Sequence, residues 1–308
     1  MASSPLDTLT NRRTPAWYTP DVPSTHAKRP EVLVALAQVA TCPGQFRRNL
    51  EQHLVMTDRA RQAGASLVLF PELSLSGYLL AHGVAEEAFS LDDPRLAELR
   101  RLSREVTILV GLPLQEERGG IANAAVLLEG GEVVGVHRKV YLPTYGMFDE
   151  GRFFLAGSAF LPLECRLGRF GVLICEDAWH PASHTMLALQ QVDALWMVAG
   201  GPTELGSETM PAGTRRWHSL VVASAITTVT PTWFVNRCGW EEGILFGGGS
   251  WAVDCLGQGL VEPASALDEA LVLARLDVAA TRHARSLRPI AVSERLDLWR
   301  ATVEAHGA

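Results

Sequence analysis

The chain has 308 residues, of which 47% are hydrophobic and 20% charged, and its formal net charge is -7. This composition suits a globular protein with a large core, and the lack of a basic stripe argues against nucleic acid or anionic membranes as partners. No apolar run approaches the roughly 18 residues of a membrane span, and the five cysteines lack paired metal-ligand spacing, which predicts free thiols in a reducing cytoplasm.

Residues 1–30 contain five prolines and no sustained hydrophobic period, which predicts an extended or disordered N-terminal arm without the apolar core of a secretory signal. Residues 31–308 contain no linker-like stretch and are expected to form one domain. Strands alternate with helices there and hairpins are inserted, which predicts a layered α/β fold with mixed sheets. In chain order we expect strand 32–39, helix 46–63, strand 67–70, helix 95–105, strand 108–112, a hairpin of 124–128 with 133–137, a hairpin of 161–166 with 170–175, helix 182–191, strand 194–198, helix 215–227, strand 232–235, strands within 249–261 and at 270–276, and helix 292–304.

Three of these strands end at side chains with useful chemistry. Glu72 and Lys139 each follow a predicted strand, and Cys175 closes an apolar run directly before the polar residues Glu176 and Asp177. Sites in α/β proteins are built at the carboxyl ends of strands. The pattern therefore predicts that a carboxylate, an ammonium group and a thiol meet at one edge of the fold.

These three groups supply a base, a cation and a nucleophile. Lys139 can stabilise a thiolate on Cys175 and, with the backbone N–H that follows the cysteine, the oxyanion formed when a carbonyl is attacked. Glu72 can take the thiol proton and pass it to a leaving amine. Taken singly, each residue also has a purely structural interpretation, since a buried cysteine often serves as a small hydrophobe and a strand-end lysine or glutamate is often solvated.

The same residues lie in segments that resemble the nitrilase, or carbon–nitrogen hydrolase, superfamily from about residue 31 to the C-terminus. Each segment is a weak signal alone, but together they follow the family's order, which makes the resemblance specific. The segments are 34–38, with its glutamine, 70–73 with Glu72, 76–78, 138–143 with Lys139, 174–177 with Cys175, 236–239, 248–250 and Asp254.

The resemblance implies a four-layer αββα sandwich with a catalytic triad of Glu72, Lys139 and Cys175, and it implies neither a metal nor another cofactor. Glu150 matches a second glutamate of such sites, which would hold Lys139 charged or orient the attacking water; its structural alternative is a loop-stabilising carboxylate. The family association also implies a homodimer or a higher homo-oligomer.

Within the family, residues 142–150 and 175–179 resemble the glutaminase domain of glutamine-dependent NAD synthetases. In that comparison Tyr145 and Glu176 match positions that hold the α-amino end of the substrate glutamine, as a phenol and a carboxylate would hold an ammonium group. The resemblance does not extend to an ATP-dependent synthetase domain. The segment 199–202, which includes Gly200 and Gly201, also stands where that branch usually has an Asn and a Ser at the site, so glutamine specificity stays open.

Trp179 and His180 follow Cys175 closely and are expected to line the substrate pocket. His180 and His184 are four residues apart, at metal-ligand spacing on a helix, but two such ligands are common by chance and the pocket role is favoured.

The sequence as a whole predicts a cytoplasmic amidase that hydrolyses a small linear carboxamide to an acid and ammonia through a cysteine thioester. Two enzyme alternatives stay open, namely a stand-alone glutaminase that feeds ammonia to a separate synthetase chain and a nitrilase. An alternative from another class is a non-catalytic binding scaffold, against which the intact triad argues.

Overall fold

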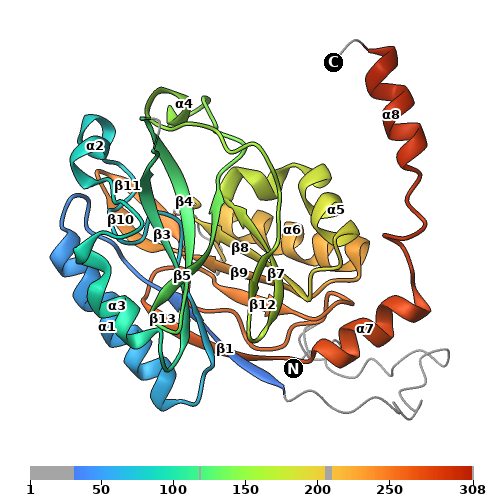
Figure 1. Ribbon diagram of the computed structural model, residues 1–308, viewed down its shortest axis with the longest axis horizontal. Helices are drawn as coiled ribbons and strands as arrows, with labels where there is room; N and C mark the ends of the chain where they lie inside the picture. The colour runs from blue at the N-terminus through green and yellow to red at the C-terminus, as the bar shows by residue number, and fades with distance from the viewer. Residues whose placement is uncertain (1–30, 118, 205–209, 307–308) are drawn as a thin grey trace, which may run out of the picture.

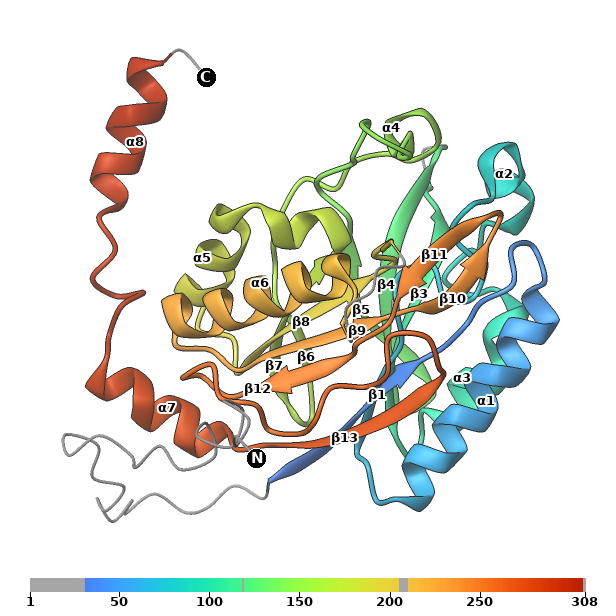
Figure 2. The same ribbon diagram turned by 180° about the vertical axis from the view of Figure 1, so that it is seen from behind.

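The computed structural model describes residues 31–117, 119–204 and 210–306, so the predicted arm at 1–30 lies outside the described residues. Two β-sheets pack face to face, with helices on the outer face of each, as the two opposite views in Figure 1 and Figure 2 show. The four-layer αββα sandwich expected from the sequence is therefore confirmed. No helix in the described part of the chain is long and apolar enough to cross a membrane.

The first sheet has six strands in the order β13-β1-β2-β3-β4-β5. Strands β1, β2 and β3 run parallel and the remaining neighbours run antiparallel. Helices α1 and α3 cover its outer face (Figure 2). The elements are β1 (Val32–Gln38), α1 (Phe46–Gln62), β2 (Leu67–Leu69), α2 (Val84–Glu87), α3 (Ala97–Leu102), β3 (Thr107–Gln115), β4 (Ile121–Glu129), β5 (Glu132–Arg138) and β13 (Ala270–Leu276).

The second sheet has five strands in the order β12-β9-β8-β7-β6, of which β7, β8 and β9 run parallel. Helices α5 and α6 cover its outer face, and α8 stands away from the sandwich (Figure 1). The elements are α4 (Glu150–Phe153), β6 (Leu163–Cys165), β7 (Gly168–Ile174), α5 (Pro181–Leu189), β8 (Ala194–Ala199), α6 (Ala212–Thr228), β9 (Thr232–Asn236), the separate hairpin of β10 (Cys238–Glu241) with β11 (Ile244–Gly247), β12 (Trp251–Val253), α7 (Val278–Leu287) and α8 (Leu296–Ala305).

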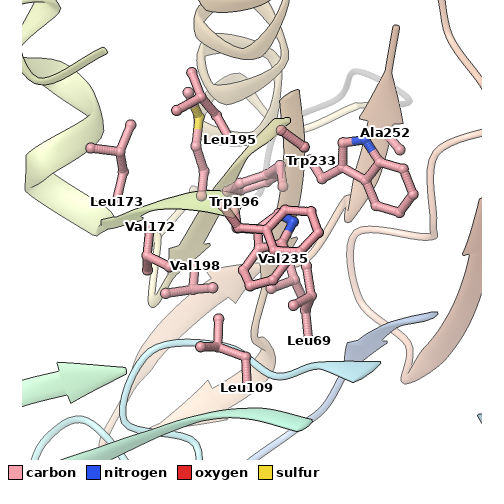
Figure 3. Packing of buried hydrophobic residues seen from close by; sticks show 14 of the residues in the cluster. Leu69, Leu109, Val172, Leu173, Leu195, Trp196, Val198, Trp233, Val235 and Ala252 are labelled. Carbon is pink, nitrogen blue, oxygen red and sulfur yellow. The ribbon is translucent and has the colours of Figure 1, made fainter. Parts of the chain in front are cut away.

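The core between the sheets follows from the alternation of side chains along the strands. Leu69 and Leu109 of the first sheet lie opposite Val172, Val198 and Val235 of the second, as Figure 3 shows. Neighbouring residues on β1 and β2 point instead to the outer face, where they pack with α1 and α3. Because each strand is apolar on both faces, these strands read in the sequence as unbroken apolar runs.

One prediction about elements was wrong in part, and some elements were not predicted. Only 251–253 of the predicted strand region 249–261 is a strand, because the side chain of Asp254 accepts hydrogen bonds from the N–H groups of Leu256 and Gln258 (2.8 and 2.9 Å) and turns the chain. The β10–β11 hairpin was not predicted. Helix α7 was also missed, although Asp277 caps it by accepting from the N–H of Ala280 at 2.8 Å.

Candidate active site

The strand ends bring the predicted groups together from both sheets. Glu72 follows β2 and Lys139 follows β5, and the pairing of the first sheet makes these two strands point the same way. Cys175 follows β7 of the second sheet, and Glu150 begins α4. All four side chains are buried. The sandwich thus encloses a carboxylate pair, an ammonium group and a thiol at one edge.

Lys139 lies between two carboxylates. Its Nζ donates to Oε1 of Glu72 at 2.7 Å and to Oε1 of Glu150 at 2.6 Å. Burial alone would lower the pKa of Lys139, but the negative charges around it, Glu72 first, raise that pKa above its ordinary value. The side chain therefore stays an ammonium group. Two of its three N–H bonds are used by the carboxylates, which leaves one for a further acceptor.

Glu72 is held by contacts that the sequence analysis did not identify. Asn123 Nδ2 donates to Oε1 at 2.8 Å, and the backbone N–H of Gly200 donates to Oε2 at 2.7 Å. Asn123 carried a signal, since it is a polar residue inside the apolar strand β4, whereas a backbone N–H such as that of Gly200 has none. These contacts fix the carboxylate's orientation beside the thiol.

Cys175 is a buried thiol in an uncommon backbone conformation. Its φ is 47°, in the left-handed region that residues other than glycine rarely adopt, and such strain is concentrated at functional sites. Burial raises the pKa of the thiol well above its ordinary value, the negative charge of Glu72 raises it further, and Lys139 acts in the opposite direction. The thiol therefore favours its protonated form, and Glu72 is the carboxylate whose charge acts on it most strongly.

The turn that carries Glu72 is shaped in a similar way. Leu73 also has a φ of 47°. This turn packs directly onto β3 at Gly111, where an added Cβ would lie 2.3 Å from the backbone oxygen of Pro71 and 2.5 Å from the nitrogen of Leu73. Only glycine fits such a close approach. The position of the carboxylate thus depends on a glycine in a different strand.

Glu150 has a second partner, Tyr78, whose hydroxyl donates to the same oxygen that accepts from Lys139. Burial raises the pKa of Glu150 to about 7, against the opposing effect of Lys139. Its other oxygen, Oε2, is buried without a hydrogen-bond partner. Tyr78 and Glu150 also line a cavity of about 320 Å³ together with Phe148 and Phe153. The sequence analysis had placed Tyr78 in a family segment but gave it no role.

The four residues expected to bind substrate lie around this centre and are more exposed. Tyr145 donates its hydroxyl to Oε2 of Glu176 at 2.7 Å, and burial followed by that bond raises the pKa of Tyr145 to about 12. His180 stacks on Tyr141 with ring centroids 3.6 Å apart, and its Nε2 lies 3.7 Å from Oε1 of Glu176. Trp179 is 42% exposed and packs edge-on against Trp217. We call Tyr145, Glu176, Trp179 and His180 the rim.

The two glycines after β8 have a visible packing role. An added Cβ on Gly201 would lie 2.4 Å from Nε1 of Trp217, so the indole ring occupies the space that a side chain there would need. His184, the other histidine considered as a metal ligand, is buried, and its Nε2 forms a hydrogen bond with the backbone oxygen of Ala178 at 2.7 Å. Among the described residues, no group of three or more His, Cys, Asp or Glu side chains is arranged to hold a metal ion.

Comparisons with known proteins agree with this architecture. Residues 33–286 match the carbon-nitrogen hydrolase family. A glutamine-dependent NAD(+) synthetase of Acinetobacter baylyi is 27% identical over 250 residues, which cover 81% of this chain and 45% of the synthetase. An N-carbamoylputrescine amidase of Arabidopsis thaliana is 25% identical over 302 residues, which cover 92% of this chain and 99% of the amidase.

A solved structure of an amidase from Nesterenkonia sp. AN1 aligns with a TM-score of 0.73 and 25% identity, covering 88% of this chain and 96% of the amidase. That structure shows covalent addition of the acetamide moiety of fluoroacetamide at its active-site cysteine. This chain spans about half the length of the synthetase relatives that it matches. From the extent of the family match and the shared fold, we conclude that the chain belongs to the carbon–nitrogen hydrolases of the nitrilase superfamily.

Proposed function

We propose that the protein is an amidase that hydrolyses a small linear carboxamide to the acid and ammonia through a thioester on Cys175. The observation that carries this proposal is the buried cluster at the strand ends, in which Lys139 donates to Glu72 at 2.7 Å and to Glu150 at 2.6 Å and the charges of Glu72 and Lys139 act on the buried Cys175 thiol. A base, a nucleophile and a cation brought together and shielded from water are the groups that acyl transfer needs.

In the first half of the proposed reaction, Glu72 accepts the Cys175 proton while the sulfur attacks the amide carbon. The carbonyl oxygen becomes an oxyanion, which the remaining N–H of Lys139 and the backbone N–H of Glu176 stabilise. The intermediate then collapses: the carbon–nitrogen bond breaks, the proton on Glu72 passes to the leaving nitrogen, and ammonia departs. An acyl thioester on Cys175 remains, with Glu72 again ionised.

In the second half, water attacks the thioester carbon as Glu72 takes one of its protons. The same two donors stabilise the second oxyanion, the carbon–sulfur bond breaks, and the proton on Glu72 returns to the sulfur. Glu150 assists by holding Lys139, to which it is hydrogen-bonded at 2.6 Å. Acid and free enzyme are the products, so that no proton or electron is left over.

A second candidate is a stand-alone glutaminase that passes ammonia to a separate synthetase chain. The specific observation in its favour is the pair of Tyr145 and Glu176, whose carboxylate is within reach of a substrate ammonium group at the rim. Against it stands the Gly200–Gly201 pair, which offers no polar side chains where the resembling branch has two. The synthetase relatives are also about twice as long as this chain, so their activity is not carried over.

The test is ammonia release from a panel of linear carboxamides, glutamine and nitriles, with Cys175→Ala as the blank. Cys255→Ala is a matched control, because this buried cysteine follows β12 at the opposite edge of the second sheet. We expect aliphatic amides to be hydrolysed by the wild type and the control, and not by the blank. Release from glutamine alone would favour the glutaminase, and faster turnover of nitriles would favour a nitrilase. No turnover in the panel, with Cys175 inert to iodoacetamide, would overturn the enzyme mechanism.

A further inference from the structure

The two groups that must meet in this site come from different sheets. Lys139 belongs to the end of β5 in the first sheet and Cys175 to the end of β7 in the second. The sheets themselves meet through apolar side chains, which attract without fixing a direction. Something more directional is needed to hold an ammonium group and a sulfur atom in register across that interface.

The buried carboxylate of Asp177 connects the strand ends of the two sheets by hydrogen bonds. Oδ1 of Asp177 accepts hydrogen bonds from the backbone N–H groups of Val140 and Tyr141, both at 2.9 Å. Oδ2 accepts from the backbone N–H of Ile174 at 3.1 Å and pairs with Nε2 of His137 at 3.0 Å. The carboxylate therefore has four partners, three of which belong to the strand end and loop of the first sheet.

We infer that Asp177 and His137 are positioning residues that lock the Lys139 loop to the Cys175 turn, a role that rests on the proposed amidase function. The contacts bracket both reactive residues. Lys139 lies between His137 and Val140, and both of these bind Asp177. Cys175 lies between Ile174 and Asp177 itself. A shift of either strand end relative to the other must break one of these hydrogen bonds.

Burial strengthens the hydrogen bonds between Asp177 and its partners. Asp177 is fully buried and His137 is 3% exposed. Hydrogen bonds to an ionised carboxylate are about twice as strong as those between neutral groups, and burial removes competing water. Nε2 of His137 lies against Oδ2 of Asp177, so the ring tautomer with its hydrogen on Nε2 donates to this carboxylate. The imidazole ring is held in turn by stacking on Phe160, with centroids 5.7 Å apart.

Position matters here because displacement of a reacting group by about 1 Å can lower a rate about 100-fold. We therefore expect Asp177→Asn, which turns one acceptor into a donor facing other donors, to lower kcat about 100-fold. His137→Phe removes one donor and should lower kcat about tenfold. His137→Gln restores a donor near the place of Nε2 and should recover most of that loss. KM should change less than threefold in each variant, because the hydrogen bonds of Asp177 and His137 go to residues other than those of the rim.

The matched control is Asp193→Asn. Asp193 is also buried, and it accepts from the backbone N–H of Arg169 and from Nη2 of Arg282, each at 3.0 Å, but it precedes β8 at the edge away from the site. Its variant should lose thermal stability without losing kcat per folded molecule. Equal losses of kcat in Asp177→Asn and Asp193→Asn would show a merely structural role and overturn the inference, as would failure of His137→Gln to exceed His137→Phe.

Two readouts do not need a substrate. Iodoacetamide should alkylate Cys175 at least about fivefold more slowly in Asp177→Asn, because Lys139 no longer sits in place to stabilise the thiolate. Hydrogen exchange at the backbone of residues 139–142 should also accelerate in that variant and not in Asp193→Asn. If the wild type hydrolyses no amide, the proposed function fails, whereas unchanged alkylation and exchange would overturn the positioning role alone. If Asp177→Asn does not fold, the comparison of kcat between His137→Gln and His137→Phe still tests the inference.

Discussion

The buried centre of the site and its rim are held in different ways. At the centre, the side chains of Lys139 and Glu72 have no exposed surface, and Glu72 accepts hydrogen bonds from three donors. At the rim, Tyr145 is 59% exposed and Trp179 is 42% exposed. Within the described part of the chain, the rim side chains make few polar contacts, chiefly the bond of Tyr145 to Glu176. The side chains of the centre are thus held by buried hydrogen bonds from several elements of the fold. The rim side chains are held mainly by contacts with residues close to them.

From this difference we expect reaction type and substrate choice to be separable in this protein. Charges at the centre interact strongly because water is excluded, whereas those at the rim are screened by solvent. A substitution at the centre should therefore lower the rate for every substrate. A substitution at the rim should alter the preference among substrates and leave the chemistry intact. Five predictions follow from this separation, in order of decreasing effect.

The largest loss is expected for Lys139→Met. Removal of the cation leaves two buried carboxylates unpaired, so we expect kcat/KM to fall at least about 1000-fold and the free energy of unfolding to fall by about 3–5 kcal/mol. Steady-state kinetics and thermal unfolding would measure the two effects. Arg138→Met is the control, since the neighbouring Arg138 pairs with Glu116 instead. A Lys139→Met enzyme with wild-type kinetics would contradict the assignment of the centre.

Glu72→Gln should separate the base from the nucleophile. Without the carboxylate, amide turnover should fall about 100- to 10,000-fold, because nothing else in contact removes the thiol proton. The negative charge of Glu72 adds to burial in raising the pKa of Cys175, so its loss should lower that pKa. Alkylation by iodoacetamide should therefore begin at a lower pH in the variant than in the wild type. Turnover and alkylation that fall together would argue instead for a collapsed site.

Glu150 should set a pH dependence, because burial raises its pKa to about 7. As pH falls through about 7 the carboxyl becomes protonated and no longer helps to hold Lys139, so kcat/KM should fall by up to about tenfold. This step should be absent from the profile of Glu150→Gln and present in that of Asp149→Asn, its exposed neighbour. An unchanged step in Glu150→Gln would assign the titration to another group.

The same group has a predictable effect on stability. The folded-state pKa of Glu150 lies above the ordinary value of 4.5, so its contribution to stability is complete below about 4.5 and is lost as pH rises through about 7. The melting temperature of Glu150→Gln relative to the wild type should therefore increase between pH 5 and pH 8. Thermal unfolding in matched buffers would measure the change.

The smallest effect is expected at the rim. Tyr145→Phe removes a largely exposed hydrogen bond, so kcat should stay within about twofold of the wild type. KM should rise about threefold for amides that carry an ammonium group near the rim, and not for simple aliphatic amides. Kinetics with such a substrate pair would check this difference. A large fall in kcat for both substrates would mean that the rim also takes part in the chemistry, which would break the separation.

Short sequence motifs supplied most of the correct predictions, and they predicted some elements better than others. The αββα sandwich and the membership in the carbon–nitrogen hydrolases were predicted correctly, because strand-length apolar runs and polar strand ends are local features of the sequence. Short, polar or irregular elements were harder. The strands expected within 249–261 ended early at the Asp254 turn, and α7, which Asp277 caps, was missed.

The sequence by itself determined which residue types leave the strand ends, and thereby that Glu72, Lys139 and Cys175 lie at one edge of the sandwich. Only the tertiary structure decided what surrounds them. The N–H of Gly200 on Glu72, the hydroxyl of Tyr78 on Glu150 and the four bonds of Asp177 join residues from separate segments. Such contacts depend on how two sheets pack, and packing is set by the whole core, which no local pattern records.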